Sequence, residues 1–174
     1  STYRKSGELK HIKDTNTFME MRSSQKAKIL QIMYLIDKFN DKGNVFFIHA
    51  GKKNLASPIY DDDFNKFAVK NKFHKFDTNE YANIDKEPDY KELNINLKKI
   101  CDGIAARVQN NDVIILDGTR ASSICFIDYF NLNTNNIGLV ILTSGSIDGK
   151  IQEINFPFIE IKNSQTINTT LNFQ

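Results

Sequence analysis

The sequence predicts an α/β fold in which a parallel sheet lies between two layers of helices. Short apolar runs alternate with segments of helical periodicity along most of the 174 residues, and this alternation implies parallel strands joined by right-handed crossovers. The runs VFFI, VIIL and LVIL are apolar throughout, as strands covered on both faces require. The 40% share of hydrophobic residues is enough for a sizeable core.

Four segments have helical periodicity. The longest covers Asp14–Asn40, where apolar residues recur at helical spacing and Gly43 lies just past the end. Polar residues fill the other face of this helix, namely Lys26, Lys28, Gln31 and Lys38. The remaining helices are predicted at Asp61–Lys70, Lys91–Gln109 and Ser122–Asn131. The negative charges of the acids at the start of the second helix are stabilised by the positive end of its dipole.

Strands are predicted in five segments between and after these helices. In chain order they are Asn44–Gly51, Lys72–Asp77, Val113–Asp117, Ile137–Thr143 and a last one near Phe156–Lys162. We therefore expect a three-layer fold with four or five parallel strands and an added N-terminal helix. No linker interrupts the pattern, so the prediction is one domain over residues 1–174. It consists of a helical extension (1–43), a sheet core (44–163) and a tail (164–174).

Composition narrows the class of protein. The 23 basic and 21 acidic residues nearly balance, whereas a dedicated nucleic-acid binder usually has a clustered basic excess. No apolar stretch reaches the length of a membrane span, and the polar start lacks the apolar core of a signal peptide. Cys101 and Cys125 have no metal-like spacing and are expected as buried free thiols. These features favour a cytoplasmic protein without a metal site.

The stretch NDVIILDGTRASSICFIDYF is the most informative part of the chain. It predicts a buried strand that ends in Asp117, a tight Gly118-Thr119 turn, and a helix that carries Asp128. Ligands of open parallel sheets bind outside the carboxyl ends of the strands. We therefore expect both carboxylates to face one crevice and to form a small-molecule site.

The region from Asn44 to about Thr143 resembles the nucleoside 2-deoxyribosyltransferase-like group, which shares a flavodoxin-like (Rossmann-like) layout with TIR-type domains. The segment ICDGIAARVQNNDVIILDGT is similar to the group's helix, strand and Asp-x-Thr turn, with Asp117 and Thr119 on the turn positions. Asp128 stands where the group places its catalytic glutamate. The strands VFFIHAG and IGLVILTS fall where the group has its own apolar strands. Tyr129-Phe130 replaces the glycine that commonly follows the glutamate.

The resemblance implies an enzyme that cleaves or transfers the N-glycosidic bond of a nucleoside or nucleotide. Asp128 would attack the anomeric carbon or stabilise the oxocarbenium ion, and Asp117 would bind a sugar hydroxyl or handle the proton of the leaving base. This chemistry needs no cofactor. The group often completes its pocket from a neighbouring subunit, so a homo-oligomer is also expected.

Ligand-binding candidates surround these acids. His49 and Gly51 end the first strand, and Lys52 follows them as a possible phosphate contact. Beside the second turn, Gly118, Thr119 and Arg120 precede a helix N-terminus, where backbone N–H groups attract anions. Ser144 follows the strand IGLVILT and is a candidate for the wall of the crevice.

Two other functions stay open at this point. Because Asp128 is shorter than the group's glutamate, the same fold could serve as a non-catalytic nucleotide-sensing or protein-interaction module. A second alternative is a magnesium-dependent nuclease, in which Asp148 and Glu160 would hold the metal and Lys162 would support the attacking water.

Overall fold

The computed structural model confirms the α/β fold and its three layers. It describes residues 25–39, 43–53, 57–82, 89–143, 147, 149–151, 153–161 and 169–170. Five parallel strands form the sheet, which is flanked by helices in a flavodoxin-like arrangement. These strands are β1 (Val45–Ala50), β2 (His74–Thr78), β3 (Val113–Gly118), β4 (Leu139–Leu142) and β5 (Phe158–Glu160). A two-residue strand, β6 (Thr169–Thr170), pairs antiparallel with β5 and was not predicted.

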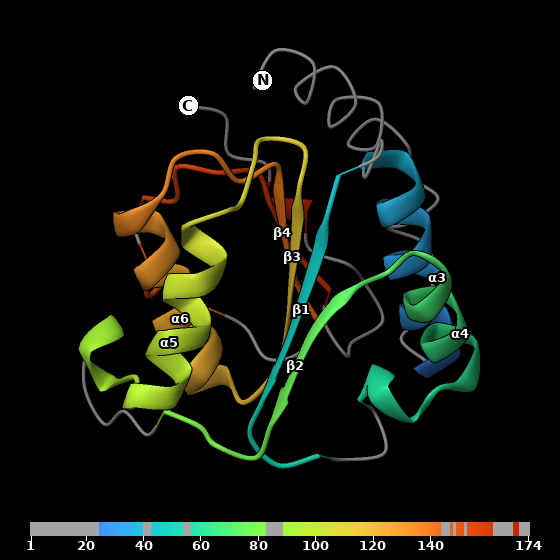
Figure 1. Ribbon diagram of the computed structural model, residues 1–174, viewed down its shortest axis with the longest axis horizontal. Coiled ribbons are helices and arrows are strands. Elements are labelled where there is room, and N and C mark those ends of the chain that lie inside the picture. The colour runs from blue at the N-terminus through green and yellow to red at the C-terminus, as the bar shows by residue number, and fades with distance from the viewer. Residues whose placement is uncertain are drawn as a thin grey trace.

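Helices cover both faces of the sheet. Figure 1 shows α3 (Gln25–Phe39) and α4 (Asp62–Lys70) on one face, and α5 (Ile95–Ala105) and α6 (Arg120–Asn133) on the other. Two 3₁₀ turns complete the connections, η1 (Pro58–Tyr60) before α4 and η2 (Tyr90–Glu92) before α5. Of the long helix predicted at Asp14–Asn40, residues 14–24 lie outside the described part of the chain.

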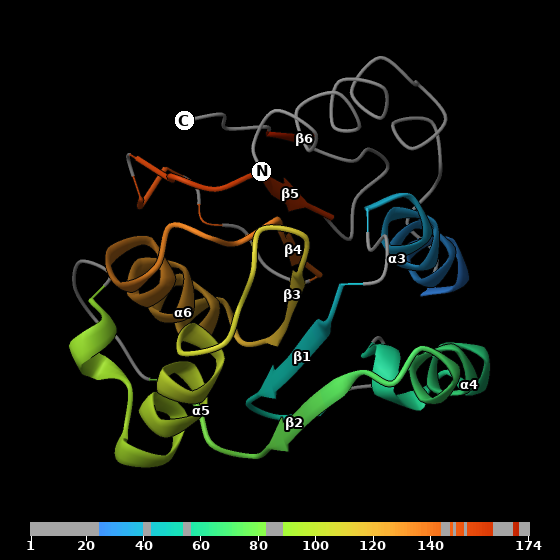
Figure 2. The ribbon, with the colours of Figure 1, turned by 45° about the horizontal axis from the view of Figure 1, so that its top comes forward.

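The strand order is β2-β1-β3-β4-β5-β6, and Figure 2 shows β2 and β6 at the two ends of the sheet. Beyond β1, the chain crosses to β2 on one side. Beyond β3, it crosses to β4 on the other side. The boundary between β1 and β3 is therefore the topological switch point, where open α/β sheets bind their ligands.

Alternate residues of each strand face opposite layers. Val45, Phe47, Val113 and Ile115 pack beneath α3 and α4. Their neighbours along the same strands pack with the buried residues of α5 and α6. This alternation decides on which face each residue at the end of a strand lies.

The amino end of β3 is held by one buried side chain. Asp112, just before the strand, accepts hydrogen bonds from the backbone N–H of Asn44 at 2.7 Å and of Gln109 at 2.7 Å. It thereby joins the start of β1 to the end of the preceding helical segment.

The structure corrects one expectation about α3. Lys28 and Gln31, predicted on its solvent face, are 3% and 2% exposed. They lie three residues apart on the helix, so they occupy the same buried side as Ile32 and Leu35.

Candidate functional site

The candidate site is a buried polar cluster at the carboxyl edge of the sheet, centred on Asp117. His49 of β1 and Asp117 of β3 are direct partners in the parallel register. Both alternate with Phe47 and Ile115, so both side chains lie on the face covered by α3 and α4. Their exposed fractions are 1% and 4%. Both residues lie near the carboxyl ends of their strands, where the sequence predicted them.

Three donors from three segments converge on the Asp117 carboxylate. Oδ2 accepts from Nδ1 of His49 at 2.8 Å and from Oγ of Ser57 at 2.6 Å. Oδ1 accepts from Oγ1 of Thr143, which follows β4, at 2.9 Å. The single hydroxyl proton of Thr143 is shared with the carbonyl oxygen of Leu116 at 3.0 Å. One carboxylate therefore links the ends of β1, β3 and β4 to the loop before η1.

The electrostatics of the cluster favour an ionised Asp117. Burial raises the pKa of this carboxyl, but hydrogen bonds from His49, Ser57 and Thr143, together with the charge of His49, outweigh burial and hold the pKa below its ordinary value.

A buried lysine of α3, Lys28, lies close enough to Asp117 for the two charges to interact. Burial lowers the pKa of the Lys28 ammonium group, and the negative charge of Asp117 opposes that change. In Figure 1 the N-terminal end of α3 lies toward the edge at which the arrows of β1 and β2 end. Three residues later along α3, Oε1 of Gln31 is buried and has no hydrogen-bond partner among the described residues.

The arrangement is not a Ser-His-Asp catalytic triad. In a triad the histidine accepts the proton of the serine, whereas here Ser57 and His49 both bind the same oxygen of Asp117. The second ring nitrogen of His49 lies 3.3 Å from the carbonyl oxygen of Gly51. Asp117 is therefore the acceptor that His49, Ser57 and Thr143 share.

The turns after β1 and β3 touch each other above this cluster. Gly51 and Gly118 have φ angles of +121° and +138°, a region that L side chains rarely adopt. A Cβ atom on Gly118 would lie 1.9 Å from the carbonyl oxygen of Ala50, and one on Gly51 would lie 2.6 Å from Cγ2 of Thr119. The glycines therefore permit the close approach of the two strand ends.

Thr119 caps the helix that follows β3. Its Oγ1 accepts from the backbone N–H of Ser122 at 3.2 Å. The hydroxyl of Ser122 in turn accepts from the backbone N–H of Ala82, after β2, at 2.7 Å. Arg120, the first residue of α6, is exposed. Helix α6 thus begins two residues earlier than predicted, because Thr119 supplies the cap.

The predicted convergence of Asp117 and Asp128 is wrong. Asp128 lies on α6, which packs on the opposite face of the sheet. Its Oδ2 accepts from the backbone N–H of Tyr90 in η2 at 2.9 Å, and the Tyr90 ring meets Tyr129 edge-on, with centroids 5.9 Å apart. Asp128 fixes η2 against α6 and is not part of the cluster around Asp117.

The other predicted residues have different outcomes. Lys52 is exposed in the loop after β1, and Lys53 pairs with Asp77 of β2 at 3.0 Å. Ser144 lies outside the described residues. Of the residues proposed for a nuclease, Asp148 and Lys162 also lie outside them, and Glu160 is buried in β5. Within the described ranges, no three His, Cys, Asp or Glu side chains are grouped so that they could hold a metal ion.

Sequence reasoning missed Ser57, Thr143 and Lys28. The strand period offered a signal for Thr143, because it continues the alternation of Leu139 and Ile141 beneath α3. Ser57 reaches Asp117 from 60 positions away in the chain, and nothing local in the sequence marks it.

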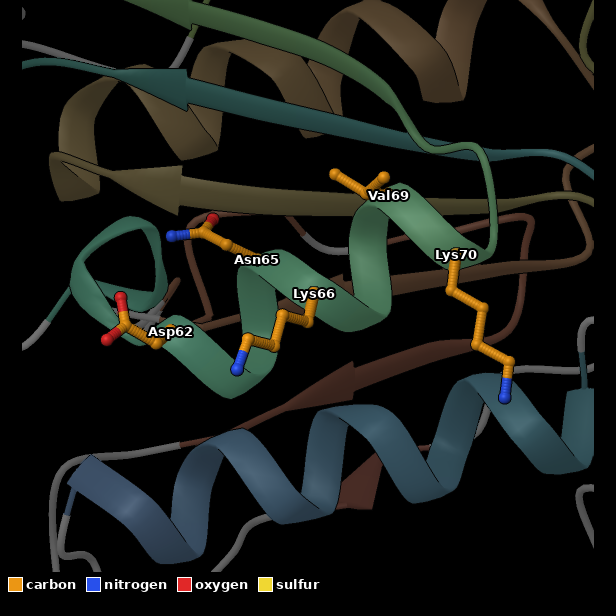
Figure 3. Close-up of a pocket in the computed structure, with 5 residues that line it drawn as sticks. All are labelled: Asp62, Asn65, Lys66, Val69 and Lys70. Carbon is orange, nitrogen blue, oxygen red and sulfur yellow. The ribbon is translucent and has the colours of Figure 1, made fainter.

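A separate shallow groove runs along the exposed side of α4. It has a volume of about 450 Å³ and is lined by Asp62, Asn65, Lys66, Val69 and Lys70 (Figure 3). These residues share one face of a single helix, and Val69 is 79% exposed. None of the residues predicted for a site lines this groove.

Among the described residues, no helix combines the length and the apolar character needed to cross a bilayer. In comparisons of the chain with protein-family models, with curated proteins and with solved structures, nothing matches.

Proposed function

We propose that this chain binds a nucleoside or nucleotide at the carboxyl edge of its sheet, with the cluster around Asp117 as the base of the site. The observation that carries the proposal is the burial of two ionisable partners, Asp117 and His49, at the switch point of a doubly wound sheet, with the charge of buried Lys28 acting on Asp117. Buried charges cost several kcal/mol each before they are compensated, on the order of the stability of a small domain. An apolar cluster would join the strand ends at a lower cost, so a role in binding accounts better for the polar one.

Positive charge near the same edge supports a phosphorylated ligand. Lys52 is exposed in the loop after β1, and Arg120 is exposed at the N-terminus of α6. Lysine acts as a point charge toward phosphate, and the N-terminus of a helix adds its backbone N–H groups. The two positions flank the boundary between β1 and β3.

The geometry favours binding over cleavage of the N-glycosidic bond. A nucleophilic carboxylate needs an accessible oxygen, but the oxygens of Asp117 already accept three hydrogen bonds. Asp128 lies on the other face of the sheet. The proposal is therefore a nucleotide-sensing module, with Asp117 as a positioning residue.

Calorimetry and thermal shift with adenosine, AMP, ADP and NAD test this proposal. Binding at a hundredfold excess over Kd stabilises the native state by about 2.7 kcal/mol, which gives a clear rise in Tm. Replacing Lys52 with alanine should weaken binding of the phosphorylated ligands and leave adenosine unaffected. The same change at Lys99, an exposed lysine of α5, is the control.

Variants of the two aspartates distinguish nucleotide binding near Asp117 from catalysis by Asp128. Asp117→Asn should abolish binding in a protein that circular dichroism shows to be folded, and Asp128→Asn should bind like the wild type. Equal affinity of the folded Asp117→Asn variant and the wild type, or no shift with any ligand, would contradict the proposal. Chromatography of the same mixtures detects free base. Release of free base by the wild type that is lost in Asp128→Asn would instead support an enzyme that cleaves the N-glycosidic bond.

A further inference from the structure

Strand β2 forms one edge of the sheet in the described part of the chain. It bonds to β1 along its length, and among the described residues no strand lies beyond it. At the other end of the sheet, β6 covers β5, as Figure 2 shows. An unpaired strand presents a row of backbone N–H and C=O groups, and this row is a template for a strand from another chain.

The sequence of β2 is complementary to itself when it is reversed. It reads His-Lys-Phe-Asp-Thr, with Phe76 at its centre and Lys75 and Asp77 on either side. Lys75 and Asp77 are both exposed, and they share one face of the strand because they are two residues apart. Phe76 points to the other face and packs, partly buried, against the core on the α5 and α6 side.

We propose that β2 pairs antiparallel with β2 of a second copy of this chain, about a two-fold axis that passes between the two Phe76 residues. In this register each Lys75 lies opposite Asp77 of the other copy, because a two-fold interface repeats every contact in both directions. The two Phe76 side chains meet on the opposite face. The two six-stranded sheets would thereby become one continuous sheet.

In this register the charges of Lys75 and Asp77 attract the second copy and do not repel it. Charged residues on an edge strand commonly prevent pairing. Here both ion pairs are attractive in the two-fold register, and opposite charges on facing strands stabilise a pair. The existing ion pair between Lys53 and Asp77 has partners that are 36% and 30% exposed, so Asp77 is accessible to a second cation. Pairing of two short strands buries little surface, and we therefore expect a reversible dimer that depends on concentration.

Sedimentation equilibrium of single and mixed charge variants tests the register. Lys75→Asp alone gives a strand with two acids, and Asp77→Lys alone gives one with two lysines. Each should dimerise about tenfold more weakly or worse than the wild type, because both cross-strand pairs become repulsive. An equimolar mixture of the two variants restores both attractive pairs, so the mixture should dimerise more tightly than either variant alone.

Lys150→Asp is the matched control. It makes the same change of charge in an exposed loop residue after β4, away from β2, and it should dimerise like the wild type. Circular dichroism establishes that each variant is folded. A wild type that stays monomeric up to millimolar concentration overturns the proposal. Single variants that dimerise like the wild type, or a mixture that stays monomeric, overturn it equally.

Discussion

Replacing Gly118 with alanine tests the close approach of β1 and β3 at the switch point. The backbone of Gly118 has φ +138°, and a Cβ atom there would lie 1.9 Å from the carbonyl oxygen of Ala50. Holding an L side chain in such a conformation costs roughly 1–3 kcal/mol. Pushing the two strand ends apart costs roughly a further 1–3 kcal/mol. We therefore expect Gly118→Ala to lower the free energy of unfolding by about 2–6 kcal/mol.

Urea unfolding followed by circular dichroism measures this loss. The midpoint should fall with little change in slope, because the surface exposed on unfolding is similar. In a chain of this length the Tm should fall by roughly 4–24 °C. Gly103→Ala is the matched control, since Gly103 lies in α5 with no atom within 4 Å of the added Cβ. That change should stabilise the helix by about 0.5–1 kcal/mol. A Gly118→Ala protein as stable as the wild type would refute the contact between the strand ends.

Three further predictions follow from the described contacts. The pKa of Asp117 is lowered in the folded state. Its contribution to stability is therefore complete above its unfolded pKa of about 3.9 and is lost as pH falls below that value. The unfolding free energy, measured from neutral to acid pH, should therefore fall less steeply in Asp117→Asn than in the wild type. Burial raises the pKa of the Cys101 thiol, and it raises the pKa of the Cys125 thiol to about 11. Neither thiol should therefore react with a disulfide reagent at pH 8 until urea unfolds the chain. Rapid labelling of the folded protein would refute their burial. Thr119→Ala removes the cap of α6 and should cost about 1 kcal/mol by urea unfolding, whereas Thr119→Ser should cost much less.

The sequence was sufficient to predict the fold because its strands are apolar throughout. Runs such as VIIL are typical of a sheet that is covered on both faces, and the alternation with helices leaves parallel pairing as the simplest topology. Strand β6 was missed because two residues give no period. Helix α3 was placed correctly where it is described, but the polar character of Lys28 and Gln31 wrongly put them on its solvent side.

The site was predicted in part, and its error has a physical origin. Asp117 and His49 were found because they end neighbouring strands. Asp128 was misplaced because proximity in the sequence was read as proximity in space. The strand period puts Asp117 on the α3 and α4 face, while the helix after β3 covers the opposite face. Ser57 and Lys28 come from segments whose approach to Asp117 depends on tertiary packing, which local patterns do not encode.

An aspartate at each end of strand β3 fixes that end to neighbouring segments. Asp112 secures the amino end through backbone donors, and Asp117 secures the carboxyl end through side-chain donors. Because both ends of β3 are held by hydrogen bonds and β1 and β4 lie on either side, we do not expect the strand to fray. Its backbone amides should therefore exchange with solvent only when the entire domain unfolds. The proposed ligand would then have to be accommodated by movements of the connecting loops, while the centre of the sheet stays fixed.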